Sequence, residues 1–397
     1  MKLPNTHELH VSVDVGCYKH HISVGLASGE YLGDFEINHD KAGFADFFEH
    51  VEQYKQQSNG QVSVAMEGYN GHARPLDKMV LSKHYRLLNI NNLKLARFKE
   101  IFPGAAKTDP IDSRKGLELF QLQQTLPLAK NVLQEVYTTP QENQELKQLS
   151  RRRKRLVNER VRYLNTLQSD LRALSPGLVE ITHDVKSVWY LNFLSSSADL
   201  RILARKNRAT LLNIKGVGKK YVEVILGWQK TAIFSDDVEY MSDLIQQDVA
   251  RIIELRNMIK SLDKRIAELL EHSEIGQRLL SIQGFGLTCC GVLSGEIGCI
   301  ERFKKESSLA LYLGMASLDN SSGKRQGSKK PKQVNKHAKA AMMTAVDHQR
   351  RGNEESQRYY EKKRNEGKTH NQAIRSLGRH LCRVIFKMLK NNRDYYI

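Results

Sequence analysis

Four carboxylate residues in the first part of the chain have the types and the spacing that metal-dependent chemistry needs. Asp14 stands inside an otherwise apolar, strand-like segment, where an unpaired charge costs free energy. Glu67 ends a second apolar segment, and Asp109 and Asp112 lie three residues apart, on one face of a helical turn. Carboxylate oxygens are preferred ligands of Mg²⁺. Four of them can hold two Mg²⁺ ions about 4 Å apart, which activate and stabilise oxygens during phosphodiester cleavage.

A structural role is open for the last two of these residues. Asp109 is a good N-cap, the proline after it suits the first helical position, and Asp112 suits the first turn of a helix. Such a start caps a helix without any metal. What favours the metal site is that all four carboxylates fall within one α/β segment of a strongly basic protein.

Strands and helices alternate in the segment that carries these carboxylates. Apolar–polar alternation and short apolar runs predict strands at 9–15, 21–26, 31–37, 62–66 and 87–90. Helical patterns lie near 41–56, 72–82 and 92–100. Three early strands followed by strand–helix alternation predict an α/β domain with a mixed sheet. At the ends of neighbouring strands, Asp14 and Glu67 can converge on one cation.

The chain is strongly basic. Lys and Arg total 62 against 44 Asp and Glu, which gives a formal net charge of +18 and a pI near 9.6 over 397 residues. This excess indicates a polyanionic partner, either nucleic acid or an anionic membrane surface. No apolar run is long enough to span a bilayer, and the N-terminus lacks the apolar core of a signal peptide. We therefore expect nucleic acid as the partner, in the cytoplasm, with no membrane.

The five cysteines include no CxxC pair. A disulfide framework and a zinc ribbon are therefore disfavoured, and small buried residues in a reducing compartment are expected.

A long, charged helical region follows from about residue 141. An apolar stripe runs to a Pro-Gly stop at 176–177, and apolar residues recur at heptad a and d positions from Ile252 to Leu269. The two segments fit the arms of a helical hairpin or an intermolecular coiled coil, and equally helices packed on their own domain. We expect a homo-oligomer, either a dimer or a tetramer.

Two segments, 212–220 and 280–287, repeat an apolar–x–Gly–apolar–Gly pattern. It is typical of a helix-hairpin-helix, in which glycines let backbone N–H groups approach a phosphate, although a Gly-x-Gly turn between packed helices needs no ligand. Lys215, Lys219 and Lys220 favour phosphate contact for the first copy. The apolar residues after the second copy favour a structural role there.

Further basic residues form clusters that suit a phosphate backbone. One cluster on the long helix contains Arg151, Arg152, Arg153, Lys154 and Arg155. Another follows a Ser-Ser-Gly turn and contains Lys324, Arg325, Lys329, Lys330, Lys332 and Lys336. A third lies at 362–364. A solvated loop or helix face predicts the same composition, so charge alone does not separate DNA binding, RNA binding and solvation.

Three segments of the N-terminal domain resemble the signature blocks of the DEDD transposases. They are 11–16 (Val-Ser-Val-Asp-Val-Gly), 65–69 (Ala-Met-Glu-Gly-Tyr) and 107–112 (Lys-Thr-Asp-Pro-Ile-Asp). These transposases form insertion-sequence family one-hundred-and-ten with its subgroup eleven-eleven, and Piv-type DNA invertases are related to them. The resemblance implies a RuvC-like fold, an RNase H-type sheet flanked by helices. It places the family's metal-binding tetrad on Asp14, Glu67, Asp109 and Asp112.

The segment 313–327 resembles the same family, in which a Ser-Gly pair follows a Gly-Leu-x-Pro stretch. The family's nucleophilic serine carries over to Ser322, whose hydroxyl would attack a phosphodiester and conserve the bond energy in a phosphoserine link. The sequence departs from the family pattern in two places, because Ser317 replaces the usual proline and the usual glycine before Asn335 is missing. Ser321 therefore stays open as the nucleophile.

The order of these segments implies three domains. They are a RuvC-like nuclease domain at 1–125, a helical spacer with a helix-hairpin-helix-like motif at 126–275, and a mainly α C-terminal transposase domain at 276–397. The resemblance implies a Mg²⁺-dependent recombinase that excises and inserts a mobile DNA element. It also implies a noncoding RNA that selects donor and target DNA, and an active site whose carboxylate and serine halves come from different protomers.

Three other functions fit parts of the pattern. A Piv-like invertase shares the chemistry but inverts a fixed DNA segment. A RuvC-like nuclease needs only the carboxylates and leaves Ser322 inert. A non-catalytic nucleic-acid-binding protein uses the carboxylates only to cap helices and to pack.

Overall fold

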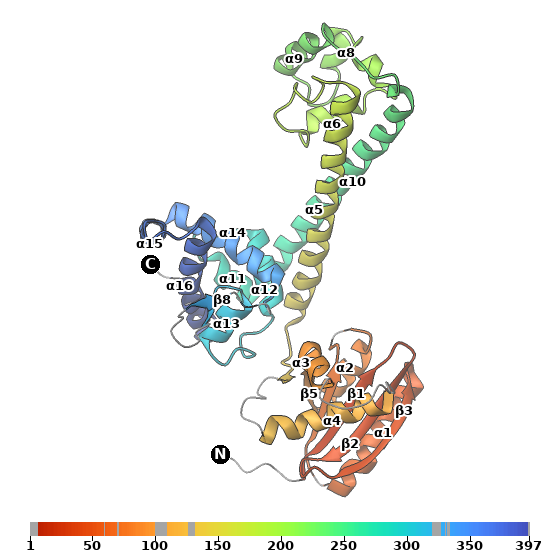
Figure 1. Ribbon diagram of the computed structural model, residues 1–397, viewed down its shortest axis with the longest axis vertical. Coiled ribbons are helices and arrows are strands. Elements are labelled where there is room, and N and C mark those ends of the chain that lie inside the picture. The colour runs from red at the N-terminus through yellow and green to blue at the C-terminus, as the bar shows by residue number, and fades with distance from the viewer. Residues whose placement is uncertain are drawn as a thin grey trace. The chain divides into compact units, whose positions relative to one another are not determined.

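The computed structural model of the protein describes residues 7–58, 60–69, 71–99, 109–125, 132–319, 327–329, 331 and 334–395. The chain forms two compact units, residues 1–138 and residues 139–397. The first unit is an α/β structure and the second is almost entirely helical (Figure 1). The predicted fold class, an α/β domain followed by a mainly helical part, is confirmed.

A six-stranded mixed sheet with the order β3-β2-β1-β4-β5-β6 forms the centre of the first unit. Its strands are β1 (Leu9–Val15), β2 (Lys19–Leu26), β3 (Tyr31–Asn38), β4 (Val62–Glu67), β5 (Arg86–Ile90) and β6 (Leu133–Glu135). β2 pairs antiparallel with both β1 and β3, whereas β1–β4 and β4–β5 are parallel pairs. The five predicted strands are confirmed. The short β6, which no apolar run marks, adds an antiparallel edge to β5.

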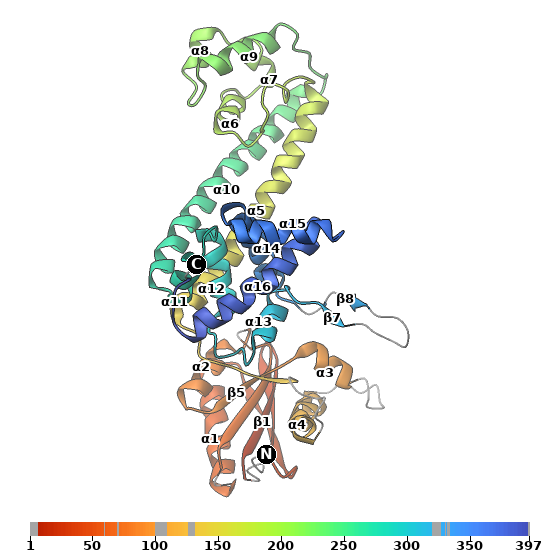
Figure 2. The ribbon, with the colours of Figure 1, turned by 90° about the vertical axis from the view of Figure 1, so that its left-hand side faces the viewer.

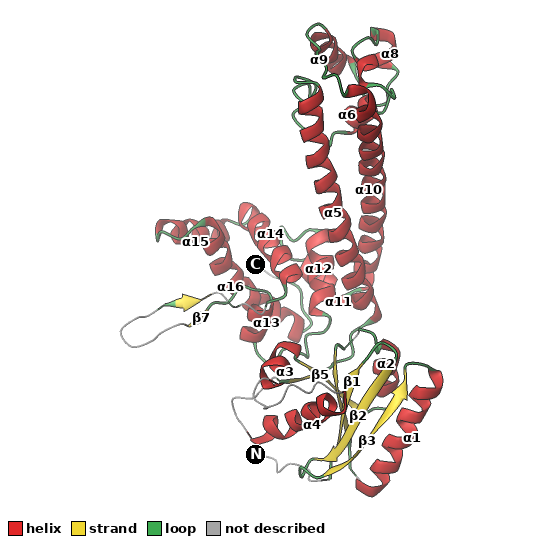
Figure 3. Cartoon of the chain, turned by 45° about the vertical axis from the view of Figure 1, so that its right-hand side comes forward, coloured by secondary structure: helices red, strands yellow, loops and turns green. Residues whose placement is uncertain are grey.

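Helices cover both faces of this sheet (Figure 3). α1 (Lys41–Ser58) and α2 (Arg74–Ser82) pack on the face that carries Val11 and Val13 of β1. α3 (Asn92–Lys99) and α4 (Asp109–Thr125) contribute to a second core, in which Leu119 packs with Ile90 of β5. The three helices predicted between the strands are therefore confirmed. The two cores leave β1 with one apolar face toward α1 and one more polar face toward α4.

Two long helices, α5 (Gln141–Leu174) and α10 (Val238–His272), dominate the second unit. Leu156, Leu255 and Ile259 form part of the buried seam between them. Ion pairs join Arg251 to Glu159 and, nearer the other end, Arg265 to Glu145, so the two helices run antiparallel. Among the arrangements that the sequence left open, this intrachain hairpin is the one observed (Figure 1).

Small helices close the far end of the hairpin. They are α6 (Val188–Leu194), α7 (Leu200–Leu203), α8 (Arg208–Leu212) and α9 (Lys219–Gln229), and they share a core with both arms.

A second helical bundle packs at the base of the arms, where α12 lies against α5 (Figure 2). It consists of α11 (Glu274–Leu280), α12 (Leu287–Ile297), α13 (Glu306–Tyr312), α14 (Lys336–Gly352), α15 (Glu354–Asn365) and α16 (His370–Lys390). The short strands β7 (Leu318–Asp319) and β8 (Ser328–Lys329) pair with each other between α13 and α14. In the described part of the chain no helix is long and apolar enough to cross a membrane.

Candidate metal centre and nucleic-acid interface

Two of the predicted metal ligands stand at the same edge of the sheet. β1 and β4 pair in parallel with Val13 opposite Met66, and Asp14 and Glu67 are the next residues of the two strands. Because the carboxyl ends of parallel neighbours meet at one edge, both carboxylates lie side by side there. The side chains of both residues are half-buried.

Strand alternation turns these two carboxylates toward α4. Val13 and Met66 lie in the core with α1 and α2, so the residues that follow them face the opposite side of the sheet. α4 lies directly on that side, since a Cβ atom at Gly116 would come within 2.1 Å of Ser12 Oγ. The hydroxyls of Ser113 and Ser23 are 2.7 Å apart and tie the same helix to β2.

α4 carries the other two predicted ligands at its start. The helix begins at Asp109, whose side chain lies outside the described residues, and Asp112 follows one turn later. Asp112 is only 8% exposed, and its Oδ1 lies 3.9 Å from Lys115 Nζ. Since α4 packs on β1 and β2, its first turn is held over the face that carries Asp14. Backbone pairing and helix packing thus bring three described carboxylates and the start of α4 to one side of the sheet.

The described carboxylates share one side of the sheet but do not by themselves form a closed metal site. Among the described side chains, which include Asp14, Glu67 and Asp112 but not Asp109, no group of three His, Cys, Asp or Glu residues is close enough to hold a metal ion. His10 lies in β1 and stacks on Phe120, and His20 lies in β2 beside His39.

Sequence reasoning gave no role to His21, which neighbours the site. It pairs with Asp14 in the β1–β2 register, and directly opposite residues of an antiparallel pair share a face. Its Nε2 lies 3.5 Å from Asp34 Oδ2 of β3. The sequence contained a signal for this position, because a short turn between Val15 and Lys19 places His21 opposite Asp14 in an antiparallel pair.

Much of the serine segment lies outside the residues that the structure describes. Ser321, Ser322, Lys324, Arg325, Lys330 and Lys332 lie outside the described residues. Lys329 belongs to β8, and its backbone pairs with that of Leu318 in β7. Lys336 is exposed at the start of α14.

A buried hydrogen-bond network borders this segment, and sequence reasoning missed it. Glu296 of α12 is 1% exposed and accepts hydrogen bonds from Arg151 Nε (2.7 Å) and from Asn335 Nδ2 (2.7 Å). Asn335 Nδ2 also donates to Tyr312 Oη, while its Oδ1 caps α14 by accepting from two backbone N–H groups. Burial by itself raises the pKa of Glu296, but the hydrogen bonds from Arg151 and Asn335 hold that pKa below its ordinary value.

This network changes the interpretation of the basic cluster on α5. Arg151 is engaged by Glu296, and Arg153 pairs with Asp263 of α10. Arg152, Lys154 and Arg155 are exposed and form no ion pair with any described residue. The nucleic-acid role of the five cations stays a prediction, with these three as the better-placed members.

Both Gly-x-Gly segments form turns between two helices. Gly216 and Gly284 have positive φ (89° and 85°), which favours glycine, and α9 and α12 begin directly after each turn. A Cβ at Gly284 would come within 2.6 Å of the α14 backbone, so this copy packs against its own bundle. The equivalent Gly216 is less tightly packed, since a Cβ there would lie 3.4 Å from Trp189, and the second glycine has open space in both copies. What distinguishes the first copy is that Lys215, Lys219 and Lys220 are exposed beside it.

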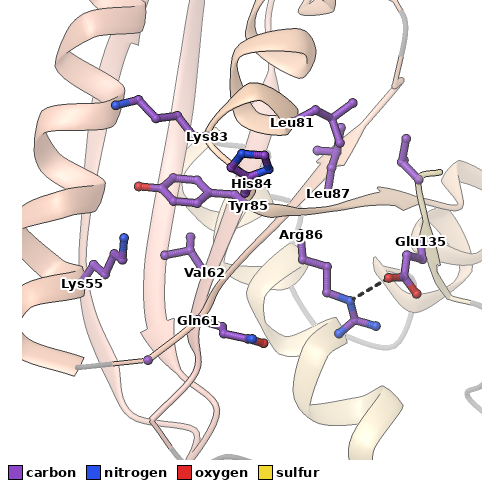
Figure 4. A pocket seen from close by; sticks show the side chains of 12 residues that line it. Lys55, Gln61, Val62, Leu81, Lys83, His84, Tyr85, Arg86, Leu87 and Glu135 are labelled. Carbon is purple, nitrogen blue, oxygen red and sulfur yellow. Dashed lines mark ion pairs between the residues drawn. The ribbon is translucent and has the colours of Figure 1, made fainter. Parts of the chain in front are cut away.

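The first unit also has a cavity of about 470 Å³ at the edge where β4 and β5 begin (Figure 4). Several cations line it, but much of their charge is already matched. Arg86 Nε lies 3.4 Å from Glu135 Oε1, and Lys55 Nζ lies 3.3 Å from Glu52 Oε2. Because β1, β4 and β5 are parallel, this edge is opposite the one that holds Asp14.

Two segments of the chain match models of known protein families. Residues 11–176 match a DEDD transposase family model described as "Transposase", and residues 276–361 match one described as "Transposase IS116/IS110/IS902 family". The chain belongs to the IS110 family of DEDD transposases. Its first matched segment contains the whole carboxylate set, and its second contains the segment around Ser322.

Three relatives of this IS110-family transposase come from insertion elements. The IS116 44.8 kDa protein of Streptomyces clavuligerus is 25% identical and covers 96% of this chain and 95% of its own. The IS110 43.6 kDa protein of Streptomyces coelicolor is 25% identical over 76% of this chain and 75% of its own. The IS900 42 kDa protein of Mycobacterium paratuberculosis is 28% identical over 36% of this chain and 37% of its own.

Family membership establishes the class of reaction. The IS110-family transposase is a DNA-binding enzyme that transfers phosphodiesters, and a DEDD transposase depends on a divalent metal ion. The donor set suits such an ion, because oxygen ligands from Asp14, Glu67 and the buried Asp112 face the same side of an RNase H-like sheet.

Proposed function

We propose that the protein cleaves and rejoins DNA strands to excise and insert a mobile element, and that two Mg²⁺ ions are bound by Asp14, Glu67, Asp109 and Asp112. The observation that carries this proposal is the placement of Asp14 and Glu67 at the ends of adjacent parallel strands, on the face that α4 covers. Bound Mg²⁺ would supply Lewis-acid stabilisation of the phosphoryl oxygens. The sheet and α4 would hold the four carboxylates at fixed positions, which a flexible loop would not do.

The proposed nucleophile is Ser322. Its hydroxyl oxygen bonds to phosphorus, the bond from phosphorus to one deoxyribose oxygen breaks, and the hydroxyl proton ends on the released DNA hydroxyl. The phosphoserine link keeps the free energy of the broken phosphodiester, so attack by another DNA hydroxyl reverses the step and joins new strands. The metal-binding carboxylates and the serine come together in one active site, from one protomer or from two protomers of an oligomer.

Trapping of the covalent link tests this chemistry. Labelled element-end DNA with a nick near the cleavage site is incubated with protein and Mg²⁺, and the protein is denatured before electrophoresis. We expect a labelled protein band with wild type and with Ser321→Ala, and none with Ser322→Ala. Normal strand cleavage by Ser322→Ala would leave a RuvC-like nuclease as the function. A band lost only in Ser321→Ala would move the nucleophile to Ser321.

We further propose that a noncoding RNA from the element selects donor and target DNA. The large positive charge and the exposed lysines beside Gly218 support nucleic-acid partners beyond the DNA strand being cut. Sequencing of the nucleic acid that copurifies with the protein, expressed with its native flanking DNA, tests this. One discrete RNA from those flanks supports the guide. Absence of a defined RNA, with recombination intact, favours an enzyme that reads its own DNA sites, with inversion as the first alternative.

A further inference from the structure

The helix α16 is unusual in its charge. Its 21 residues include no Asp or Glu, and its basic residues are Arg375, Arg379, Arg383, Lys387 and Lys390. The longer α10 mixes both signs and forms pairs such as Lys264 with Glu268 and Arg251 with Glu254. A mixed face of that kind is what solvation alone favours, because opposite charges three or four residues apart attract each other. On α16 the same spacing puts like charges beside one another.

The five cations form one continuous face. At about 100° per residue they fall within roughly a third of the helix circumference, and they extend over about 22 Å of helix length. The opposite side, with Leu377, Leu381 and Ile385, is buried in the core of the bundle. We call these five residues the α16 basic face. α16 packs against α13, α14 and α15 (Figure 2), so the face is held on a rigid element.

Little of this charge is neutralised within the protein. In the part of the chain that the structure describes, one carboxylate reaches the face: Glu306 Oε1 of α13 lies 3.1 Å from Arg379 Nη2 and 3.3 Å from Arg383 Nε. Arg375, Lys387 and Lys390 form no ion pair with a described residue.

The neighbouring His380 lies among these cations. Its Nε2 lies 2.9 Å from Tyr359 Oη of α15. Burial and the charges of Arg383, Lys363 and Arg379 lower the pKa of this histidine. Cations from two helices therefore act together at this surface, which extends from α16 to α15.

We propose that the α16 basic face binds the sugar–phosphate backbone of duplex DNA. Charge complementarity identifies this occupant, and DNA is the polyanion that an IS110-family transposase must hold. The phosphates of each B-DNA strand advance about 3.4 Å along the duplex axis, so the face has the length of about six base pairs measured along that axis. A membrane surface does not fit, because the apolar side of α16 is buried and cannot insert into lipid. The surface assignment holds whether or not Ser322 is the nucleophile.

The test neutralises the three cations that lack an ion pair in the described structure. The full-length triple variant Arg375→Gln, Lys387→Gln, Lys390→Gln is compared with wild type by fluorescence anisotropy, using a labelled duplex of random sequence. We expect about tenfold weaker binding or more, and a fall of about 2 to 3 in the slope of log affinity against log salt, since each lost phosphate contact contributes about 0.9. The buried side of α16 is untouched, so thermal unfolding checks that the fold is retained.

A matched control separates position from net charge. The variant Lys41→Gln, Lys78→Gln, Lys260→Gln removes the same charge from exposed sites on α1, α2 and α10. The proposal requires that this control loses much less affinity and keeps the wild-type slope. Equal losses in both variants would overturn it, because net charge would then explain the result. A loss seen only with an RNA duplex of the same sequence would overturn the choice of DNA.

Discussion

The two units of the chain hold their proposed catalytic groups by different means. Asp14 and Glu67 are placed by the hydrogen-bonded ladder between β1 and β4, so backbone pairing determines where they lie. The chain on either side of the serine segment is tied instead by side chains, since Asn335 donates to the Glu296 carboxylate and to Tyr312 Oη, and Tyr312 Oη donates to the backbone carbonyl of Glu296. The comparison teaches that the carboxylate half depends on strand register, whereas the border of the serine half depends on one buried carboxylate.

The largest effect is expected from Asp14→Asn. Loss of one charged ligand removes several kcal/mol of metal-ion stabilisation, so strand cleavage should fall by about 10³-fold or more. Duplex binding, measured in parallel, should stay within twofold. The matched control is Asp46→Asn on the exposed side of α1, which should cleave normally. Normal cleavage by Asp14→Asn would show that the carboxylates only cap and pack.

The next largest effect is expected from Glu296→Ala, at the border of the serine segment. Removal of this carboxylate leaves Arg151 without its ion-pair partner and the Asn335 amide with Tyr312 Oη alone, which should lower the free energy of unfolding by about 2–4 kcal/mol. Urea unfolding followed by tryptophan fluorescence measures it, because Trp189 and Trp228 both lie in the second unit. The exposed Glu301→Ala should change the free energy by less than about 0.5 kcal/mol. Equal losses of unfolding free energy in both variants would show that the Glu296 network does not stabilise the protein.

Gly116→Ala tests the packing of α4 on the sheet. The new methyl group would meet Ser12 Oγ, so α4 and Asp112 must shift, at a cost of about 1–3 kcal/mol. We expect lower thermal stability together with weaker cleavage. Gly227→Ala on α9, where a Cβ meets no atom within 4 Å, should instead stabilise the protein by up to about 1 kcal/mol. An unchanged melting temperature in Gly116→Ala would contradict the close packing.

The smallest effect is a pH dependence. The pKa of Glu296 is lowered in the folded state, so its ionisation contributes stability above the ordinary value of 4.5, and this contribution is lost as the pH falls through the folded-state pKa. The stability difference between wild type and Glu296→Gln should therefore shrink on acidification below 4.5. Unfolding curves of both proteins at a series of pH values measure it, and a difference that grows on acidification would reverse the sign.

The sequence predicted the first unit better than the second. Apolar alternation located β1 and β4, and the ends of those runs located Asp14 and Glu67, because a strand with one buried face has a period of two that the chain itself displays. β6 was not predicted, since its three residues have little apolar character and are placed only by pairing with β5.

In the second unit the heptad pattern predicted two long helices but left their partner open. The partner is the other arm of the same chain, which the helical tip formed by α6 to α9 brings into reach. The basic cluster on α5 was predicted as one surface, yet Arg151 and Arg153 are engaged by Glu296 and Asp263. Charge clusters are visible in sequence, but their partners can be more than a hundred residues away.

By itself, the sequence determined the fold class, the family and the carboxylates that suit a divalent metal, because each depends on residue types at short, regular spacing. Tertiary structure alone decided that Asp14, Glu67 and Asp112 face one side of the sheet, that Glu296 joins Arg151 to Asn335, and that the cations of α16 remain largely unpaired. These facts depend on contacts between distant segments. No local pattern encodes such contacts, since they arise only when packing brings separate elements together.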